Sequence, residues 1–210
     1  MRWKSGSKRR IQKKVKVNNI LFIYNHKFKM NKHQIRQLAK DTRSNRTLKE
    51  MHKLGDSIRT QLFSHFKFEE YPNILIYLSS MEKGEIDTWK IIHQLIGHNV
   101  YVPRIDSDEK LKLVKYDNIF SRNKYGIFEC TGAELSPRID LTIIPVMAFD
   151  TRGNRIGFGK GYFDSLLATL ESKLLIGLCA DHPHSGWTAE SHDVAMDYVV
   201  TPDKVYKFSQ

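Results

Sequence analysis

The sequence predicts an α/β fold with a largely parallel sheet. Short apolar runs typical of buried strands alternate with segments whose apolar residues recur every three or four positions, as in helices. Such alternation is typical of strand–helix–strand units, which place their strands side by side in parallel. A chain of 210 residues suits one domain with a small extension. No run approaches the roughly 20 apolar residues of a membrane-spanning helix, so we expect no membrane partner.

The first part of the predicted domain is mainly helical. Residues 31–66 carry apolar side chains mostly three or four positions apart, and Gly55 is the weak point of that pattern. Residues 73–79 form a short apolar run after a proline, which predicts a buried strand. Residues 85–96 are amphipathic and predict a helix that ends at Gly97.

The middle of the chain is expected to contribute two strands and a polar region between them. Residues 100–105 predict a strand that Pro103 breaks. Residues 106–138 are polar and rich in turn residues, with one strand near 111–116. Residues 141–149 form the most apolar run and predict the central strand of the sheet.

The last part of the chain completes the alternating pattern. After a glycine-rich loop, residues 162–170 predict a helix. Residues 174–180 predict another buried strand, and residues 194–201 predict an edge strand ended by Pro202. Residues 31–210 are therefore expected to form a single α/β domain.

The positive charge is concentrated near the N-terminus. The net charge is +11, yet no Asp or Glu precedes Asp41, and 13 of the 34 Lys and Arg residues lie in the first forty positions. We expect residues 1–30 to be a basic, disordered extension. A mitochondrial presequence and a nucleic-acid tether are the alternatives. Since the remainder is near neutral, a nucleic-acid partner is disfavoured. Two cysteines fit a reducing compartment, so we expect a cytoplasmic protein, or a mitochondrial one if the extension is a presequence.

A glycine-rich loop carries the clearest chemical signal. Gly157, Gly159 and Gly161 alternate after a predicted strand and before a predicted helix. Glycines let backbone N–H groups approach an anion closely, and a helix start adds further free N–H groups. Arg155 and Lys160 add positive charge beside them. The loop therefore predicts a phosphate-binding site, against the alternative of a tight turn without a ligand.

The spacing of this loop differs from two common phosphate motifs. Neither the dinucleotide pattern G-x-G-x-x-G nor the nucleotide pattern G-x-x-x-x-G-K-[ST] is present. Asp164 follows the glycines and offers an oxygen ligand for Mg²⁺. Three histidines, His182, His184 and His192, are interpreted as surface residues of loops rather than as a transition-metal site.

The run from Arg155 to Asp164, which reads RIGFGKGYFD, resembles the signature of the 5-formyltetrahydrofolate cyclo-ligases, also called methenyltetrahydrofolate synthetases. Residues 144–150 and 153–155 also match that family's approach to the loop, and the resemblance spans about residues 31–201. It implies a single-domain, Rossmann-like three-layer α/β sandwich. It also implies ATP as co-substrate, Mg²⁺ and a folate substrate. We expect the protein to be a monomer.

The resemblance extends to individual ATP-site residues. Lys32 and Arg36 match the family's N-terminal pair, and at positions i and i+4 of a helix they share a face, although alone they would be interpreted as solvated charges. It implies catalytic roles for Arg155, Lys160 and Tyr162. The implied ATP-binding residues are Lys32, Arg36, Arg155, Ile156, Gly157, Phe158, Gly159, Lys160, Gly161, Tyr162 and Phe163.

Further matches concern folate and magnesium. The resemblance implies folate contacts for Ser80, Glu85 and Tyr125, with Glu85 accepting hydrogen bonds from the pterin amine and ring N–H. It implies that Asp197 joins Asp164 as a magnesium ligand. Without the resemblance, Glu85 would be interpreted as a helix N-terminal residue and Asp197 as an edge-strand carboxylate. The chain has Cys130 where the family often has proline.

Together these observations predict an enzyme, an ATP-dependent cyclo-ligase that converts 5-formyltetrahydrofolate into 5,10-methenyltetrahydrofolate with release of ADP and phosphate. No obvious activated nucleophile such as G-x-S-x-G or H-E-x-x-H is present, which fits direct phosphoryl transfer. Two alternatives remain open: a nucleotide-binding paralogue with a different substrate, and a nucleic-acid-binding protein that acts through its basic extension.

Overall fold

A central sheet organises the chain. The computed structural model describes residues 30–184, 187, 189–190 and 193–208. Within them, the strand order of the main sheet is β12-β11-β10-β7-β1-β2-β3-β6. Its strands are β1 (Asn73–Ile76), β2 (Asn99–Ile105), β3 (Leu111–Lys115), β6 (Glu134–Leu135), β7 (Ile139–Pro145), β10 (Ser172–Leu178), β11 (Tyr198–Val200) and β12 (Val205–Lys207). The strands from β11 to β2 are parallel. At the edges the pairs β11–β12, β2–β3 and β3–β6 are antiparallel. The predicted α/β class is confirmed, while residues 1–29 of the predicted extension lie outside the described residues.

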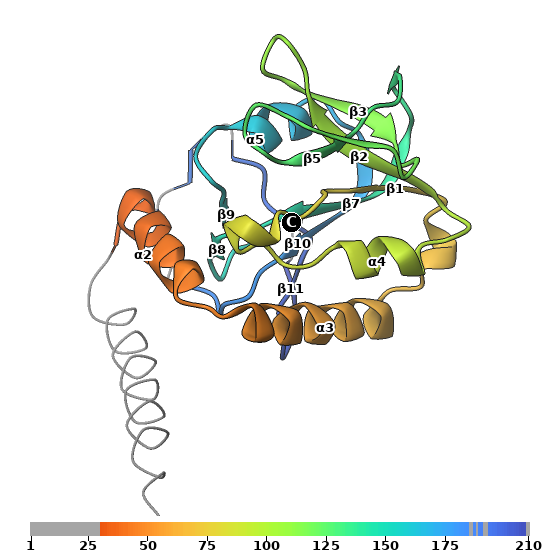
Figure 1. Cartoon of the computed structure of the whole chain (residues 1–210). Coiled ribbons are helices and arrows are strands. Elements are labelled where there is room, and N and C mark those ends of the chain that lie inside the picture. The colour runs from red at the N-terminus through yellow and green to blue at the C-terminus, as the bar shows by residue number, and fades with distance from the viewer. Residues whose placement is uncertain (1–29, 185–186, 188, 191–192, 209–210) are drawn as a thin grey trace, which may run out of the picture.

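Helices cover both faces of the sheet (Figure 1). The described α-helices are α2 (Lys32–Ser44), α3 (Leu48–His65), α4 (Trp89–Gln94) and α5 (Tyr162–Leu167), with short 3₁₀ turns η1 (Phe68–Glu70) and η2 (Met81–Lys83). Successive residues of β1 point to opposite faces. Ile74 and Ile76 join the core beneath α3 and α4, whereas Leu75 packs with Leu166 of α5 and with Leu170. The result is the expected three-layer arrangement.

The region 31–66 is helical as predicted, and it contains two helices. Asn31 caps α2 and Thr47 caps α3, each with its side chain bonded to the backbone three residues on. The second cap ends the continuity, because Thr47 takes an extended backbone conformation. Gly55 does not interrupt α3. A Cβ there would lie 3.2 Å from Cβ of Asp87, so glycine permits close packing of the segment before α4.

Two other boundaries differ from prediction for identifiable reasons. The predicted helix 85–96 begins only at Trp89, because the Thr88 hydroxyl donates to the carbonyl of Tyr77 and thus binds this segment to the end of β1. Strand β2 continues through Pro103, which lies beyond the last register pair with β1, Leu75 with Tyr101. Its missing N–H therefore removes no bond to β1.

The predicted central strand 141–149 is divided. β7 ends at Pro145, and β8 (Ala148–Phe149) pairs instead with β9 (Arg155–Ile156) as a separate hairpin. The region 106–138 holds more strand than predicted, since β4 (Phe120–Arg122) and β5 (Phe128–Cys130) form a second hairpin and β6 joins the main sheet. The predicted helix 162–170 ends as α5 at Leu167. Within 194–201 only Tyr198–Val200 is strand, and it is internal because β12 covers its edge.

The strand order fixes where a ligand would bind. The chain passes from β1 to β2 on one side, and from β7 through β10 to β11 on the other. In open parallel sheets, ligands bind outside the carboxyl ends of the strands where the order reverses in this way. The segment after β1 carries Ser80 and Glu85, and the segment after β7 leads into the glycine loop. The topology thus brings two predicted parts of the site to one edge.

Candidate active site

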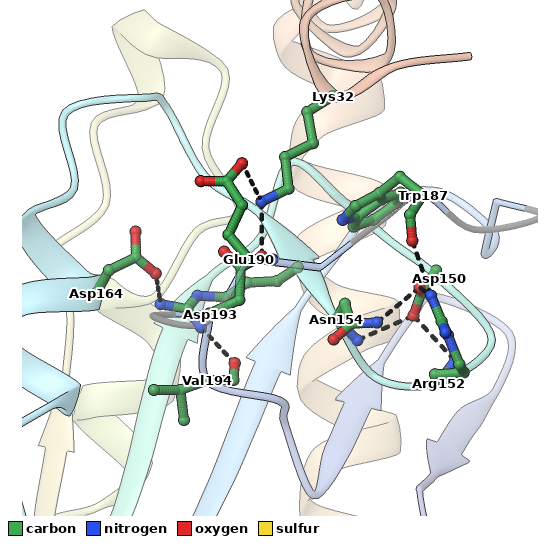
Figure 2. A network of polar contacts seen from close by, with 10 residues as sticks. Lys32, Asp150, Arg152, Asn154, Asp164, Trp187, Glu190, Asp193 and Val194 are labelled. Atoms are coloured by element: carbon green, nitrogen blue, oxygen red, sulfur yellow. Dashed lines mark hydrogen bonds and ion pairs between the residues drawn. The ribbon is translucent and has the colours of Figure 1, made fainter. Parts of the chain in front are cut away.

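The β8–β9 hairpin directly precedes the glycine loop, and polar contacts of Asp150 hold its turn (Figure 2). Asp150 is fully buried, and its carboxylate accepts hydrogen bonds from the backbone N–H of Arg152 and of Asn154, both at 2.9 Å, and from the Asn154 amide at 2.8 Å. Gly153 has φ +84°, and a Cβ there would lie 2.8 Å from the ring of Phe208. These contacts fix the conformation of the turn between β8 and β9. They therefore position the glycine loop that follows β9.

Arg155 links this hairpin to α5. Its side chain is buried, Nη1 donates to the carbonyl of Val194 at 2.6 Å, and Nη2 forms an ion pair with the carboxylate of Asp164 (Figure 2). Burial lowers the pKa of Arg155, and the carboxylates of Asp164 and Asp193 oppose that effect. The guanidinium remains a cation, because arginine does not deprotonate in this range. Two predicted site residues, Arg155 and Asp164, are therefore in direct contact.

The glycine loop borders open space and is held from one side by α2. Gly159 and Gly161 have φ values of +97° and +70°, and a Cβ at Gly157 or Gly161 would meet nothing within 4 Å. Nε of Arg36 donates to the carbonyl of Gly157 at 3.0 Å, and a Cβ at Gly159 would lie 3.3 Å from the same nitrogen. Arg36, one of the two predicted ATP-binding residues of the N-terminal helix, thus contacts the glycine loop.

Lys32 contacts the segment before β11. Its Nζ lies 2.6 Å from Oδ2 of Asp193 and 3.0 Å from Oε1 of Glu190 (Figure 2). Burial on its own lowers the pKa of Lys32, but the hydrogen bonds with the two carboxylates outweigh it and leave the pKa raised. Lys32 is therefore a cation that carboxylates already hold, one helical turn from Arg36.

Lys160 lies between two tyrosines. Its Nζ is 3.6 Å from the centroid of the Tyr125 ring and 5.7 Å from that of Tyr162. The hydroxyls of Tyr125 and Tyr162 are 3.2 Å apart, and this hydrogen bond lowers the pKa of Tyr125 and raises that of Tyr162 to about 12. A cavity of about 360 Å³ adjoins them, lined by Glu109, Lys110, Lys160, Tyr162 and Ser165. Tyr125, predicted to contact folate, thus lies beside the loop lysine.

Ser80 and Glu85 form a small unit after β1. Oε2 of Glu85 accepts the backbone N–H of Ser80 at 2.8 Å. Burial raises the pKa of Glu85, while this hydrogen bond and the charges of Arg43 and Lys83 oppose the rise. A carboxylate can accept further hydrogen bonds besides this one, so the predicted folate contact of Glu85 stays a prediction.

The two predicted magnesium ligands have separate partners. Asp164 pairs with Arg155, whereas Oδ2 of Asp197 accepts the backbone N–H of Leu175 at 2.7 Å. In the described part of the chain, no three His, Cys, Asp or Glu side chains gather as a preformed metal site. Magnesium that accompanies a nucleotide needs only one or two carboxylates besides the phosphates, so Asp164 fits such an ion. Joint binding by Asp164 and Asp197 stays a prediction.

One histidine interpretation is wrong. His184 is buried, and its backbone N–H donates to the carbonyl of Phe149 at 2.8 Å, because the segment pairs with the β8–β9 hairpin. Burial lowers the pKa of His184. The side chain of His182 is exposed as predicted, and His192 lies outside the described residues.

Sequence reasoning missed several residues that shape the site. Asp193 and Glu190 were not predicted as partners of Lys32, and no local pattern points to a contact so distant along the chain. Arg43 was also missed, although a signal exists. It lies three helical turns after Lys32 on the same face, and its side chain is buried behind the glycine loop.

Comparison with known proteins identifies the family to which the sequence is similar. The sequence profile of the 5-formyltetrahydrofolate cyclo-ligase family matches residues 28–202. A 5-formyltetrahydrofolate cyclo-ligase from Haemophilus influenzae is 30% identical over 153 residues, which cover 68% of this chain and 81% of that protein. A probable 5-formyltetrahydrofolate cyclo-ligase from Schizosaccharomyces pombe is 27% identical, over 72% of this chain and 85% of that protein.

The fold also matches a solved structure. The Aquifex aeolicus 5,10-methenyltetrahydrofolate synthetase superposes with a TM-score of 0.69 and 24% identity, covering 86% of this chain and 94% of that chain. This match concerns the architecture, while the family follows from the sequence. With a profile that spans most of the chain and a glycine loop built as described, the chain belongs to the 5-formyltetrahydrofolate cyclo-ligase family.

Proposed function

We propose that this chain catalyses the ATP-dependent cyclisation of 5-formyltetrahydrofolate to 5,10-methenyltetrahydrofolate, with release of ADP and phosphate. The observation that carries the proposal is the glycine loop, which follows the buried hairpin, borders open space and has Arg36, Arg155 and Lys160 around it. Membership of the family supports this reaction over the alternative of a different substrate.

The chemistry suits a site without a protein nucleophile. The formyl oxygen is a poor leaving group, so the γ-phosphoryl group of ATP is transferred to it and ADP leaves. Folate N10 then attacks the formyl carbon, the C–O bond breaks, and the oxygen departs as phosphate. Phosphoryl transfer depends mainly on positioning and on stabilising negative charge. Cations and backbone N–H groups provide both, and these are what the loop and its neighbours offer.

The cations have distinct proposed roles. Arg36 and Lys32 bind the ATP phosphates from the side of α2, and Lys32 exchanges its carboxylate partners for phosphate oxygens. Lys160 stabilises charge on the transferred group. Arg155, held by Val194 and Asp164, fixes the start of the loop and adds positive potential. Tyr162 supplies a neutral hydroxyl at neutral pH, as a phenol does, and this hydroxyl is hydrogen-bonded to that of Tyr125. Ile156, Phe158 and Phe163 complete the proposed ATP surface.

The folate side is proposed on the other side of the strand reversal. Glu85 would accept hydrogen bonds from the pterin amine and ring N–H, and Ser80 keeps its carboxylate in place. The Tyr125 ring, beside Lys160, would stack on the substrate. Magnesium bound by Asp164, with Asp197 as second candidate ligand, would neutralise phosphate charge during the transfer.

The setting of the reaction is also a proposal. We infer a single α/β domain over residues 31–210 that acts as a monomer, without a nucleic-acid partner. Among the described residues, no helix is long and apolar enough to cross a membrane. Cys130 and Cys179 are buried thiols without a disulfide, which supports a reducing compartment such as the cytoplasm. A mitochondrial location remains the alternative if the basic N-terminal residues act as a presequence.

The experiment is an absorbance assay for the methenyl chromophore. Purified protein is mixed with 5-formyltetrahydrofolate and Mg²⁺, with and without ATP. We expect the chromophore to appear only with ATP, and one ADP to form for each product. A protein that binds ATP but forms no product would contradict the proposed substrate and favour the paralogue alternative. Omitting Mg²⁺ and adding a chelator tests the metal.

A further inference from the structure

A buried arginine joins the two halves of the site. Arg43, in the last turn of α2, is only 7% exposed. Its Nη2 donates to the carbonyl of Val146 at 2.8 Å, directly after β7, and its Cζ lies 5.2 Å from the centroid of the Phe158 ring in the glycine loop. One guanidinium therefore contacts both the exit of β7 and the loop to which it leads.

The same arginine also borders the segment after β1. Gly84, with φ +67°, packs against it so closely that a Cβ there would lie 3.4 Å from Cβ of Arg43. The next residue is Glu85, whose carboxylate is near enough for the positive charge of Arg43 to act on it. Arg43 thus lies at the reversal of strand order, between the segments after β1 and β7.

Arg43 retains unused hydrogen-bonding capacity. Its Nη1 is buried and has no hydrogen-bond partner among the described residues. A buried unpaired donor on a cation costs free energy, so something must compensate for it. The compensation that we infer comes from the position of Arg43 between Glu85 and Phe158. The charge stabilises the Glu85 carboxylate, and the flat guanidinium supports the Phe158 ring.

We propose, resting on the function above in which the loop binds ATP and Glu85 binds folate, that Arg43 is a positioning residue that holds these two groups in register. It touches neither reacting atoms nor substrate. Its charge favours the carboxylate form of Glu85 and its guanidinium packs against the Phe158 ring, so one side chain orders the folate and ATP sites.

The neighbours of Glu85 determine the direction in which its pKa shifts when Arg43 is replaced. Its charged and titratable neighbours are Arg43 from α2, Lys83 from η2 and Tyr77 after β1. Burial raises the pKa of Glu85, and the positive charge of Arg43 opposes that rise. Without this charge the pKa of Glu85 should rise further. Any reaction step that needs the Glu85 carboxylate then loses its rate at a higher pH than in the wild type.

The variants separate charge from shape. Arg43→Met removes the charge, and Arg43→Lys keeps the charge but loses the flat group that faces Phe158. Arg46→Met is the matched control. Arg46 is also mostly buried, also has an unpartnered Nη1, and pairs with Asp181, away from the glycine loop. All three variants are made in the full chain, and folding is checked by circular dichroism and thermal unfolding.

The first readout does not require activity. Carbon-13 NMR of glutamate carboxyls, with Glu85 assigned by Glu85→Gln, gives its pKa in each variant. We expect a higher pKa in Arg43→Met and values near the wild type in Arg43→Lys and Arg46→Met. An unchanged Glu85 pKa in folded Arg43→Met would overturn the proposal.

The second readout is the cyclisation assay. We expect Arg43→Met to lower kcat/KM for the folate by about tenfold or more. In the pH–rate profile of this variant, the acid limb, where activity falls as the pH decreases, should lie at a higher pH than in the wild type. Arg43→Lys should keep the acid limb and raise KM for ATP. Variants of Arg43 that behave like Arg46→Met would contradict the proposal. If the wild type forms no product, the proposed function fails instead, and the NMR titration decides the role of Arg43.

Discussion

Nζ of Lys32 and Oδ2 of Asp193 lie 2.6 Å apart, although 161 positions separate the two residues in the sequence. Their ion pair, with Glu190 as a second partner, joins the first helix of the domain to the segment before β11. The proposed ATP phosphates would compete with both carboxylates for the same ammonium. On the proposed function, nucleotide binding would exchange this contact.

Lys32→Ala is expected to raise KM for ATP by roughly tenfold to hundredfold, because one charge-assisted contact to phosphate is lost. The value for kcat should change less. The control is Lys40→Ala, an exposed position of the same helix. Equal KM values for wild type and Lys32→Ala would exclude Lys32 from the ATP site.

Lys160→Ala and Asp164→Asn are each expected to lower kcat, by about 10²–10³-fold, while the fold persists. Lys160 would no longer stabilise the transferred group, and Asp164→Asn would remove both the proposed magnesium ligand and the charge that pairs with Arg155. Steady-state rates and circular dichroism check this. A folded variant with near-normal turnover would refute the role of that residue.

Gly153→Ala is expected to destabilise the protein by about 2–4 kcal/mol. Its φ of +84° disfavours any side chain, and the new Cβ would lie 2.8 Å from the Phe208 ring and 2.9 Å from the carbonyl of Met196. Gly157→Ala is the control, since a Cβ there meets nothing within 4 Å. Urea unfolding compares the two. Equal midpoints would show that the hairpin tolerates a side chain.

The stability contributed by Asp140 should depend on pH. Hydrogen bonds from Lys173 at 2.7 Å and from the backbone of Asn73 lower the pKa of its carboxyl. Its contribution is therefore complete above the unfolded pKa of about 3.9 and disappears as the pH falls through the lower folded value. Asp140→Asn should reduce the unfolding free energy at pH 6 and show a shrinking difference below about pH 4. The exposed Glu69→Gln is the control.

Removal of residues 1–29 is expected to leave cyclisation largely intact, because Lys32 and Arg36 remain. Kinetics of the shortened protein test this directly. A nucleic-acid function would instead appear as binding that falls steeply with salt and vanishes on truncation. Loss of turnover without these residues would mean that they form part of the enzyme.

Local signals in the sequence proved the most informative. The glycines at 157, 159 and 161 and the basic residues beside them predicted a loop after a strand and before a helix, which is what the structure contains. The capping pattern of Thr47 and Glu50 was an equally clear signal. It would have divided the helical region 31–66 into its two helices. The short strands β4, β5 and β6 were missed because they lie in polar sequence with little alternation.

Contacts between distant segments were beyond sequence reasoning. The bond from Arg36 to Gly157 and the ion pair of Lys32 with Asp193 depend on how α2 packs against the β8–β9 hairpin, and no spacing encodes that. The same applies to Asp197. Asp197 directly precedes β11, and its carboxylate accepts the backbone N–H of Leu175, a contact that exists only once β10 and β11 are paired.

The packing of Phe208 against Gly153 has a consequence for biosynthesis. Phe208 follows β12, and its N–H donates to the carbonyl of Asp197 at 2.9 Å. The support beneath the hairpin is therefore among the last parts of the domain to leave the ribosome. Until Phe208 is available, the hairpin before the glycine loop lacks the aromatic ring that packs against Gly153. A chain that stops before this phenylalanine would lack the ring that packs against Gly153 beside the proposed nucleotide site.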